Sequence, residues 1–240
     1  MELLSTKVIS NEFLGAGFFL LEVENLWGES ISPGQFFQIR VSKSFSPFLS
    51  RPFSVFFADA TSLWFLIKVV GIGTELLSEK KRGDQVSLLG PLGKGFPELP
   101  NPTLAAGGSG LGPIYFYAKK VGNFKRFLWG LKSRPPEGLV DLLKELNVSV
   151  ITEDGSEGKK GLITDFINEQ EDRIIYACGP LPMLRNLKNF KTSDVWVSIE
   201  TVMACGMGLC FGCSVKKSYG LGYFRACKDG PVFNLKDIEI

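Results

Sequence analysis

The sequence has no histidine among its 240 residues. Histidine is the commonest side-chain ligand for metals and the usual general base near neutral pH. Its absence excludes histidine-based metal sites and any catalytic triad that depends on an imidazole. It also excludes a Rieske centre, in which two histidines replace two of the four cysteines. Metal or redox chemistry in this chain must therefore use other ligands.

Other common features are missing as well. No apolar run approaches the ~20 residues of a membrane-spanning helix. The apolar stretch 13–21 is bracketed by Glu12 and Glu22, which makes it a poor signal peptide. The formal net charge of +2 gives no reason to expect nucleic acid or an anionic membrane as a partner. We therefore expect a soluble protein of the cytoplasm, where thiols stay reduced.

What the sequence does have is a group of cysteines near its end. Four of the five cysteines are Cys205, Cys210, Cys213 and Cys227, with the spacing C-x4-C-x2-C and the fourth after thirteen more residues. This resembles the plant-type spacing in which four thiolates hold a [2Fe–2S] cluster. The glycines between the first three cysteines permit tight positive-φ turns and let backbone N–H groups approach the sulfurs.

Two other uses of these thiols remain open. Structural zinc usually takes two close pairs of ligands, whereas only Cys210 and Cys213 form a C-x2-C pair here. Disulfides are disfavoured by the odd number of cysteines and by the lack of a secretory signal. The spacing favours an iron–sulfur cluster, with zinc and unligated thiols as the alternatives.

Residues 1 to about 95 are predicted to form β-structure. Short runs rich in β-branched and aromatic residues recur between turn signals such as Gly28, Pro33 and Gly83. Strands at this spacing predict a small antiparallel barrel. The runs are 18–23, 35–41, 53–57, 63–70 and 85–89.

From about residue 102 the pattern changes to strands that alternate with helices. Such alternation predicts a doubly wound parallel sheet. The boundary falls within residues 90–102, which are dense in glycine and proline. We therefore divide the chain into an antiparallel β-barrel over 1–95, an α/β domain over 96–198 and a cysteine segment over 199–240. The predicted strands are 103–106, 127–131, 148–152, 173–177 and 195–199, and the predicted helices lie near 113–121, 137–146, 162–169 and 181–189.

Two motifs in the barrel suit a flavin nucleotide. In Arg51-Pro52-Phe53-Ser54, the arginine could clamp a pyrophosphate and the serine could bond a ring nitrogen. Further on, Leu66-Ile67-Lys68 leads to Gly71-Ile72-Gly73-Thr74, where glycine N–H groups and a threonine hydroxyl could hold phosphate oxygens. In isolation, either motif is more simply a surface charge or an ordinary turn. The occurrence of both motifs, in this order, within one predicted barrel is what favours a flavin site.

Two turns in the α/β part suit a dinucleotide. The run Gly107-Gly108-Ser109-Gly110 follows the first predicted strand and opens a helix, where a doubly wound sheet binds pyrophosphate. The pair Cys178-Gly179 ends another strand at the same edge, where the thiol could touch a nicotinamide. The alternatives are a tight strand–helix turn and a buried structural thiol.

Together these motifs resemble the ferredoxin reductase superfamily over residues 1–190. The tail M-A-C-G-M-G-L-C-F-G-C, followed by C-K-D-G-P-V-F, resembles more narrowly the electron-transfer subunits of two-subunit, NAD-linked (type B) dihydroorotate dehydrogenases. So does T-E-D-G-S-E-G over 152–158, with Lys160-Gly161 and Thr164-Asp165 after it. The resemblance covers essentially the whole chain.

The resemblance implies an oxidoreductase subunit in pyrimidine biosynthesis, with FAD, a [2Fe–2S] cluster and NAD as a substrate. It implies a catalytic partner that carries FMN, in a heterotetramer of two subunits of each kind. Electrons would pass from the partner's FMN through the cluster and FAD to NAD⁺, with no catalytic acid or base in this chain.

The resemblance also implies which residues do this. FAD would be held by Arg51, Pro52, Phe53, Ser54, Leu66, Ile67, Lys68, Gly73 and Thr74; the nicotinamide nucleotide by Gly107, Gly108, Gly110, Cys178 and Gly179; and the cluster by Cys205, Cys210, Cys213 and Cys227. The aromatic residues that we expect to face the partner are Phe211, Tyr219, Tyr223 and Phe224.

Two other functions share much of this pattern. A flavin and iron–sulfur subunit of an NAD(P)H:ferredoxin-type oxidoreductase or sulfhydrogenase has similar motifs, although an aspartate in some relatives replaces the first ligand, which is Cys205 here. A zinc-stabilised, non-catalytic regulatory flavoprotein would also keep the cysteines. Ala106, Ser109 and Gly112 depart from the family pattern, so NAD binding rests on fewer matched residues than FAD binding.

Overall fold

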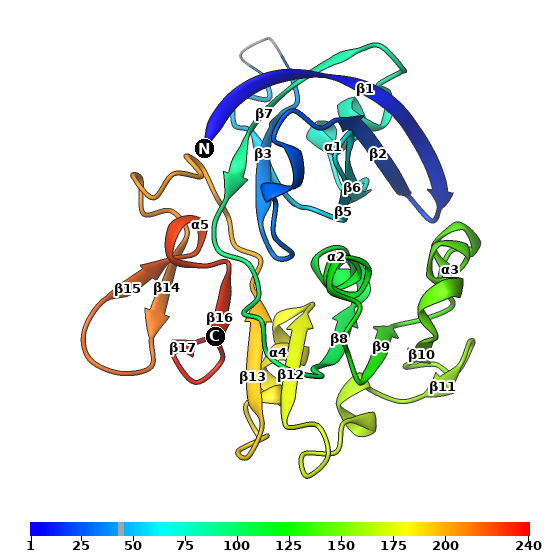
Figure 1. The fold of residues 1–240 in the computed structure, drawn as a ribbon, viewed down its shortest axis with the longest axis vertical. Helices are drawn as coiled ribbons and strands as arrows, with labels where there is room; N and C mark the ends of the chain where they lie inside the picture. The colour runs from blue at the N-terminus through cyan, green and yellow to red at the C-terminus, as the bar shows by residue number, and fades with distance from the viewer. Residues whose placement is uncertain (43–45) are drawn as a thin grey trace.

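The computed structural model describes residues 1–42 and 46–240, and it places two β-sheets one above the other (Figure 1). The sheet of the N-terminal part lies at the top of this view, and the second sheet lies below it with helix α2 (Leu111–Val121) between them. The C-terminal segment lies along one side of both sheets.

The first sheet has seven antiparallel strands and curls into the predicted barrel. Its strands are β1 (Glu2–Gly15), β2 (Phe18–Glu24), β3 (Phe36–Arg40), β4 (Arg51–Ser54), β5 (Phe57–Ala58), β6 (Ser62–Lys68) and β7 (Gln85–Leu92), with the turn η1 (Gly28–Ser30) and helix α1 (Ile72–Ser78) in the connections. Their order is β4-β3-β7-β1-β2-β6-β5. Alternate side chains, such as Phe19 and Leu21 of β2, point into a shared core with Phe37 and Ile39 of β3.

The second sheet contains the predicted parallel strands. Its elements are β8 (Thr103–Gly107), η2 (Gly108–Gly110), β9 (Arg126–Leu131), α3 (Glu137–Leu143), η3 (Lys144–Leu146), β10 (Val148–Thr152), β11 (Lys159–Lys160), η4 (Ile163–Phe166), β12 (Ile174–Cys178), α4 (Leu181–Leu187) and β13 (Asp194–Ser198). Neighbouring strands run in the order β11-β10-β9-β8-β12-β13, all parallel.

Helices cover both faces of this sheet. Leu111 of α2 and Leu139 of α3 are buried against one face, while Leu184 of α4 and Ile163 of η4 are buried against the other. The strand order reverses between β8 and β12, and a doubly wound sheet binds ligands at such a switch point, beyond the carboxyl ends of its strands. None of the helices in the described part of the chain has the length and apolar character needed to cross a membrane.

The helix predicted over 162–169 is only the short turn η4. The carboxylate of Asp165 accepts the N–H of Leu162 at 2.8 Å and fixes the start of the turn. After Phe166 the chain does not continue as a helix, because the N–H of Asn168 bonds to the carboxylate of Asp172 at 2.8 Å. A local side-chain acceptor therefore ends the helix early.

The sequence prediction also missed several strands. Strand β1 is long, but only three of its fourteen residues are buried, so its sequence lacks the longer apolar runs that identified the other strands. The C-terminal segment contains β14 (Ser214–Lys217), β15 (Tyr223–Arg225), α5 (Ala226–Asp229), β16 (Val232–Asn234) and β17 (Ile238–Glu239). Strands β15, β14 and β17 form a small sheet, whereas β16 pairs antiparallel with β13 and extends the second sheet.

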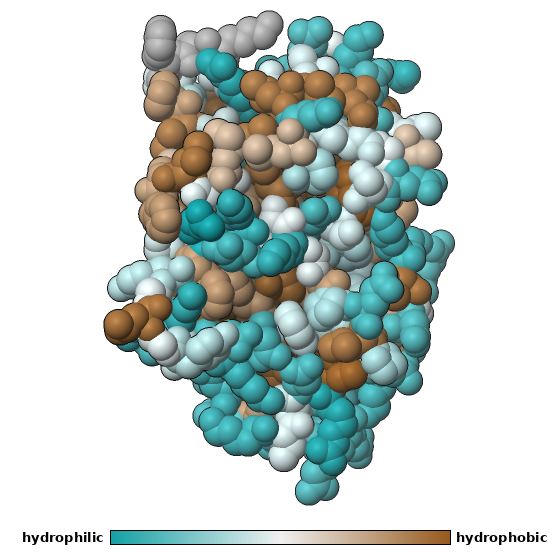
Figure 2. Space-filling model, turned by 60° about the vertical axis from the view of Figure 1, so that its left-hand side comes forward, coloured by the Kyte–Doolittle hydropathy of each residue, from teal (hydrophilic) through white to brown (hydrophobic). Residues whose placement is uncertain are grey.

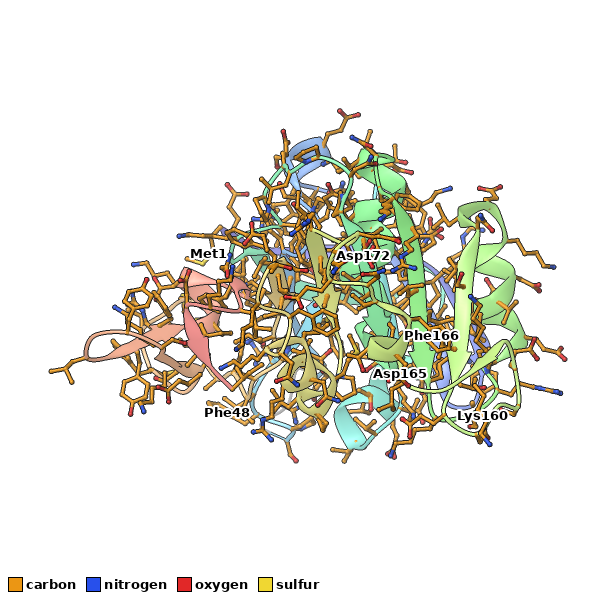
Figure 3. The ribbon with its side chains drawn as sticks, turned by 90° about the horizontal axis from the view of Figure 1, so that it is seen from below. Met1, Phe48, Lys160, Asp165, Phe166 and Asp172 are labelled. Carbon is orange, nitrogen blue, oxygen red and sulfur yellow. The ribbon has the colours of Figure 1, made fainter. Side chains whose placement is uncertain are left out.

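A buried carboxylate ties the parallel strands together at one end. Asp172, which is labelled in Figure 3, is 1% exposed and lies just before β12. It accepts hydrogen bonds from the Thr103 hydroxyl at 2.6 Å and from the guanidinium of Arg126, which also forms an ion pair with it. These bonds lower the pKa of the Asp172 carboxyl, although burial acts in the opposite direction.

Candidate cofactor and cluster site

The four C-terminal cysteines lie on two pieces of chain that fold against each other. Cys205, Cys210 and Cys213 belong to one loop, and Cys227 belongs to α5, which returns to this loop after the β14–β15 hairpin. The sulfurs of Cys213 and Cys227 are 3.2 Å apart, and both side chains are buried. All five cysteines are free thiols.

Backbone N–H groups point at these sulfurs. The sulfur of Cys205 accepts from the N–H groups of Met207 and Leu209, both at 3.4 Å, and the sulfur of Cys227 accepts from Gly208 at 3.0 Å. Cys210 accepts from Gly212 at 3.4 Å. A loop with this pattern is already arranged to stabilise negative charge on sulfur.

The two ends of the site differ in acidity. Burial alone would raise the pKa of the Cys205 thiol, but the N–H groups of Cys210, Met207 and Leu209 lower it to about 6. Burial, together with the adjacent Cys213 thiol, raises the pKa of Cys227 to about 12. Cysteine ligates iron as the thiolate, and the N–H groups directed at Cys205 favour that form of its side chain.

Glycines and one arginine shape the loop. Gly206 and Gly208 have φ of +69° and +78°, and a Cβ at Gly208 would lie 2.9 Å from the Lys228 side chain. The guanidinium of Arg225 donates to the Gly208 carbonyl at 3.1 Å and to the Asp229 carboxylate at 3.2 Å. Arg225 thus joins the loop of the first three cysteines to the helix of the fourth.

These residues fit an iron–sulfur cluster. Soft thiolate ligands suit iron and sulfide, and the N–H groups directed at the sulfurs match the way such clusters are stabilised. In the part of the chain that the structure describes, no three His, Cys, Asp or Glu side chains are arranged to hold a single metal ion.

A cavity of about 340 Å³ lies beside the cysteine loop, between the barrel and the second sheet. Seven of the nine residues predicted to bind FAD line it. They are Pro52, Phe53 and Ser54 of β4, Leu66, Ile67 and Lys68 of β6, and Thr74 of α1. The α/β part contributes Ser109, Gly112 and Pro113, so the cavity lies where the two parts meet. Its apolar walls and few polar groups fit a flavin.

The other two predicted residues, Arg51 and Gly73, lie next to each other. A Cβ on Gly73 would be 3.2 Å from Nε of Arg51, so the fold brings the R-P-F-S and G-I-G-T motifs together. The guanidinium of Arg51 also donates to the Leu49 carbonyl at 2.5 Å, which fixes its direction. A guanidinium can bind a phosphate through two parallel hydrogen bonds, so Arg51 is suited to a pyrophosphate.

The hydroxyl of Thr74 is already used within its own turn. It accepts the N–H groups of Val70 and Gly71 at 2.9 and 3.2 Å and donates to the Gly71 carbonyl at 2.8 Å. Thr74 therefore shapes the loop before α1, and its hydroxyl has little capacity left for a phosphate oxygen.

The two predicted nucleotide turns pack against each other at the switch point of the second sheet. A Cβ on Gly107 would lie 2.6 Å from the sulfur of Met183, and a Cβ on Gly110 would lie 2.4 Å from the Cys178 carbonyl. Gly108, with φ of +53°, faces open space instead. The glycines at 107 and 110 are thus required for close packing, and Gly108 leaves room at the sheet edge for a ligand.

Cys178 is completely buried, so its thiol does not lie on an open surface. Burial and the nearby charge of Glu200 raise its pKa well above the usual range. Glu200 lines the cavity between the barrel and the second sheet. Glu200 is exposed as a residue, yet the protein around its carboxyl desolvates that group and raises its pKa.

Sequence reasoning missed the residues that connect the cavity to the cysteines. Glu200, Thr201 and Met203 follow β13 and line the cavity, and Cys205 comes two residues later. Phe36 of β3 also lines this cavity. The only signal in the sequence was proximity to Cys205, because polar and apolar residues after a strand form no recognisable motif.

The surface around the cysteines is apolar. Phe211, Tyr219 and Tyr223 are each more than half exposed, whereas Phe224 packs on Phe233. Other exposed apolar side chains of this segment are Val202, Leu209 and Leu221. Figure 2, which brings the side of the C-terminal segment forward, shows hydrophobic patches over the barrel half and mainly hydrophilic surface below. By contrast, Lys160, Asp165 and Phe166 lie on the side away from this segment (Figure 3).

Comparison with known sequences gives one consistent result. The family model for the iron–sulfur cluster binding domain of dihydroorotate dehydrogenase B matches residues 200–239. The chain is 37% identical over 236 residues to the dihydroorotate dehydrogenase B (NAD(+)) electron transfer subunit of Clostridium acetobutylicum, covering 95% of this chain and 93% of that one. It is 35% identical over 246 residues to the corresponding electron transfer subunit homolog of Aquifex aeolicus, covering 98% of each.

Solved structures share the fold. An NADH-dependent reduced ferredoxin–NADP oxidoreductase superposes with a TM-score of 0.83 at 26% identity, over 98% of this chain and 89% of that one. A ferredoxin NADP⁺ reductase from Neisseria gonorrhoeae superposes with a TM-score of 0.63 at 17% identity, over 79% of this chain and 90% of that one.

Proposed function

The chain belongs to the family of electron transfer subunits of NAD⁺-linked dihydroorotate dehydrogenase B, and from that premise we propose how its residues hold the cofactors and meet a partner. Its family activity is electron transfer in an oxidoreductase, with FAD, a [2Fe–2S] cluster and NAD. When bound, the cluster carries single electrons, and FAD exchanges two electrons as a hydride with the nicotinamide.

We assign the FAD site to the cavity and to Arg51. The aromatic and aliphatic side chains of β4 and β6 would exclude water from the flavin ring, and Ser54 would orient it through a hydrogen bond. The guanidinium of Arg51, beside Gly73, would neutralise the pyrophosphate. These residues bind and orient, and they need no proton transfer of their own.

We assign the cluster to Cys205, Cys210, Cys213 and Cys227. The observation that carries the proposal is that backbone N–H groups donate to the sulfurs of Cys205 and Cys227, in a loop that begins two residues after Met203 of the cavity wall. Ile199, Glu200, Thr201 and Met203, which precede Cys205, line the cavity together with Phe36. The two cofactors would therefore be neighbours within one chain.

We assign the nicotinamide nucleotide to the edge of the second sheet. Gly107, Gly108 and Gly110 open helix α2 beside Cys178 and Gly179, and Gly108 leaves the backbone accessible. Residues 1–95, 96–198 and 199–240 would then serve as the flavin, nicotinamide and cluster domains. The last two share a sheet through β16.

We propose a catalytic partner that carries FMN and oxidises dihydroorotate, in a heterotetramer of two subunits of each kind. The exposed aromatic residues near the cysteines support this, because an aromatic patch suits the core of an interface. We also propose that the protein works in the cytoplasm, since an iron–sulfur site of free thiols needs a reducing compartment.

The test is the absorption spectrum of the purified chain, with assays for flavin, iron, sulfide and zinc. We expect about one FAD per chain, together with about two irons and two sulfides, which is the content of one [2Fe–2S] cluster. Zinc without sulfide would refute the cluster. Mixed with the FMN subunit, the chain should support dihydroorotate-dependent NAD⁺ reduction, and coupling to ferredoxin instead would favour the ferredoxin oxidoreductase alternative.

A further inference from the structure

The side-chain amide of Gln38 has no hydrogen-bond partner among the described residues, although the residue is only 2% exposed. Both Oε1 and Nε2 are buried and unpaired. A buried polar group without a partner has lost its hydrogen bonds to water without replacement, which destabilises the folded state. Such a group is rare in native proteins and indicates a partner that the polypeptide alone does not supply.

Gln38 lies in the middle of β3, against the cysteine loop. A Cβ placed on Gly206 would lie 2.7 Å from Cγ of Gln38 and 3.2 Å from its Nε2. Gly206 is buried and directly follows Cys205. The amide therefore lies next to the backbone that carries the first cysteine, and any larger residue at 206 would displace it.

The position of Gln38 favours the cluster over the flavin as its partner. Side chains two residues apart on a strand share a face, so Gln38 and Phe36 point to the same side of β3. Phe36 lines the flavin cavity, whereas Gln38 is not among the described residues that line it. The Gln38 amide thus lies on the same face of β3 as Phe36, but next to Gly206 and not in the wall of the cavity.

We propose that Gln38 is a positioning residue for the cluster, whose amide N–H donates a hydrogen bond to a sulfur at the Cys205 end. This inference rests on the proposed function, because that function supplies the cluster. A carboxamide has two N–H donors, and pairing in β3 fixes the strand that presents them. The cluster would satisfy the amide that the folded chain leaves unpaired.

The bond would act on the redox behaviour of the cluster. Hydrogen bonds to the sulfurs are among the features that set the reduction potential of an iron–sulfur centre. The reduced cluster carries more negative charge, so an N–H donor stabilises it more than the oxidised form. Gln38 would therefore raise the potential of the cluster.

The experiment is a redox titration of the full chain with both cofactors bound, followed through the electron paramagnetic resonance signal of the reduced cluster. In Gln38→Met the side chain keeps its length but loses its N–H donors. We expect unchanged iron, sulfide and FAD contents. The ratio of reduced to oxidised cluster at a fixed potential should fall about tenfold, which is about 59 mV for a one-electron couple. An unchanged potential would overturn the proposal.

Gln38→Glu provides a second variant of the same shape. It replaces the N–H donors by a carboxylate, so it should lower the potential at least as far as methionine does. Gln35→Met is the matched control, because the Gln35 amide is already paired with the Gly93 carbonyl at 3.0 Å and the Ser32 N–H at 2.8 Å. Equal shifts in Gln35→Met and Gln38→Met would refute a specific role for Gln38.

The outcomes separate this inference from the proposed function. If the wild-type chain contains no iron and sulfide, the proposed function fails and the role of Gln38 fails with it. If the wild type holds a cluster and both Gln38 variants titrate like it, only the role of Gln38 is wrong.

Discussion

The sulfur of Cys213 lies 3.2 Å from the sulfur of Cys227, on a helix that begins thirteen residues further along the chain. The two thiols are buried and not joined by a disulfide. The β14–β15 hairpin between them makes this contact, because its strands pair Ser214 with Arg225. The fold thus brings the fourth predicted ligand to the other three.

Replacing any one of Cys205, Cys210, Cys213 or Cys227 by serine should remove most of the iron and leave FAD bound. A serine hydroxyl is a poor substitute for a thiolate towards iron, and the flavin cavity is lined by other residues. Iron, sulfide and flavin assays on the purified variants measure this. Cys178→Ser is the control and should keep full iron content. Loss of iron from that variant, with retention in Cys227→Ser, would show that the ligand assignment is wrong.

Arg51→Ala should weaken FAD binding by about 1.5–3 kcal/mol, the cost of losing a charge-assisted hydrogen bond. The guanidinium is held beside Gly73 and cannot be replaced by an alkyl stub. Flavin retained after dilution and desalting measures the effect. Arg40→Ala is the matched control, because Arg40 bonds to the Ser42 carbonyl at 3.1 Å and is exposed on β3. Equal FAD occupancy in both variants would count against a role for Arg51.

Phe211→Asp should abolish dihydroorotate-dependent NAD⁺ reduction by the mixed subunits and spare NADH oxidation by artificial acceptors. Phe211 is 56% exposed beside the cysteine loop, so a carboxylate there would have to be desolvated at an interface. Leu162→Asp is the control, because Leu162 is also exposed and its N–H bonds to Asp165 at 2.8 Å, and Figure 3 shows Asp165 away from the C-terminal segment. If Phe211→Asp still supports dihydroorotate-dependent NAD⁺ reduction, Phe211 does not lie at the interface with the partner. Alone, the chain should not oxidise dihydroorotate.

Asp172→Asn should destabilise the protein by about 2–3 kcal/mol at neutral pH, because it removes the charge that pairs with Arg126. The pKa of Asp172 is lowered in the folded state, so its stabilisation is fully present above the usual carboxyl pKa. The stabilisation is lost as the pH falls through the lower, folded-state value. Thermal unfolding at a series of pH values should therefore show a smaller loss of stability below about pH 4 in the variant than in the wild type. Parallel curves would contradict this account.

The sequence predicted those strands, helices and motifs that can be identified from a few neighbouring residues. Runs such as the one that became β2 are apolar enough to identify a buried strand, and the glycine turn at Gly107–Gly110 follows from one strand and one helix. The spacing of the cysteines likewise needs no knowledge of the fold. These features together were sufficient for the fold class and for the resemblance to a family.

The remaining features depend on contacts that only the folded chain makes. Strand β16 has three residues and pairs with β13, more than thirty positions earlier, so nothing local identifies it. Gln38 belongs to a predicted strand, and its contact with Gly206 joins two segments that are far apart in the sequence. The helix expected at 162–169 was shortened by Asp172, because its carboxylate accepts the N–H of Asn168, and helix propensity does not show which N–H an aspartate will accept.

The position of the C-terminal segment has a consequence for biogenesis. Ile199, Met203 and Pro231 belong to the wall of the flavin cavity, yet they are synthesised after both the barrel and the parallel strands of the second sheet. Domains generally fold in order as they leave the ribosome. The nascent barrel can therefore form before its flavin pocket is closed, and loading of FAD must wait for the segment that also receives the iron. A chain that stops before residue 199 would therefore contain a folded barrel but an incomplete flavin pocket.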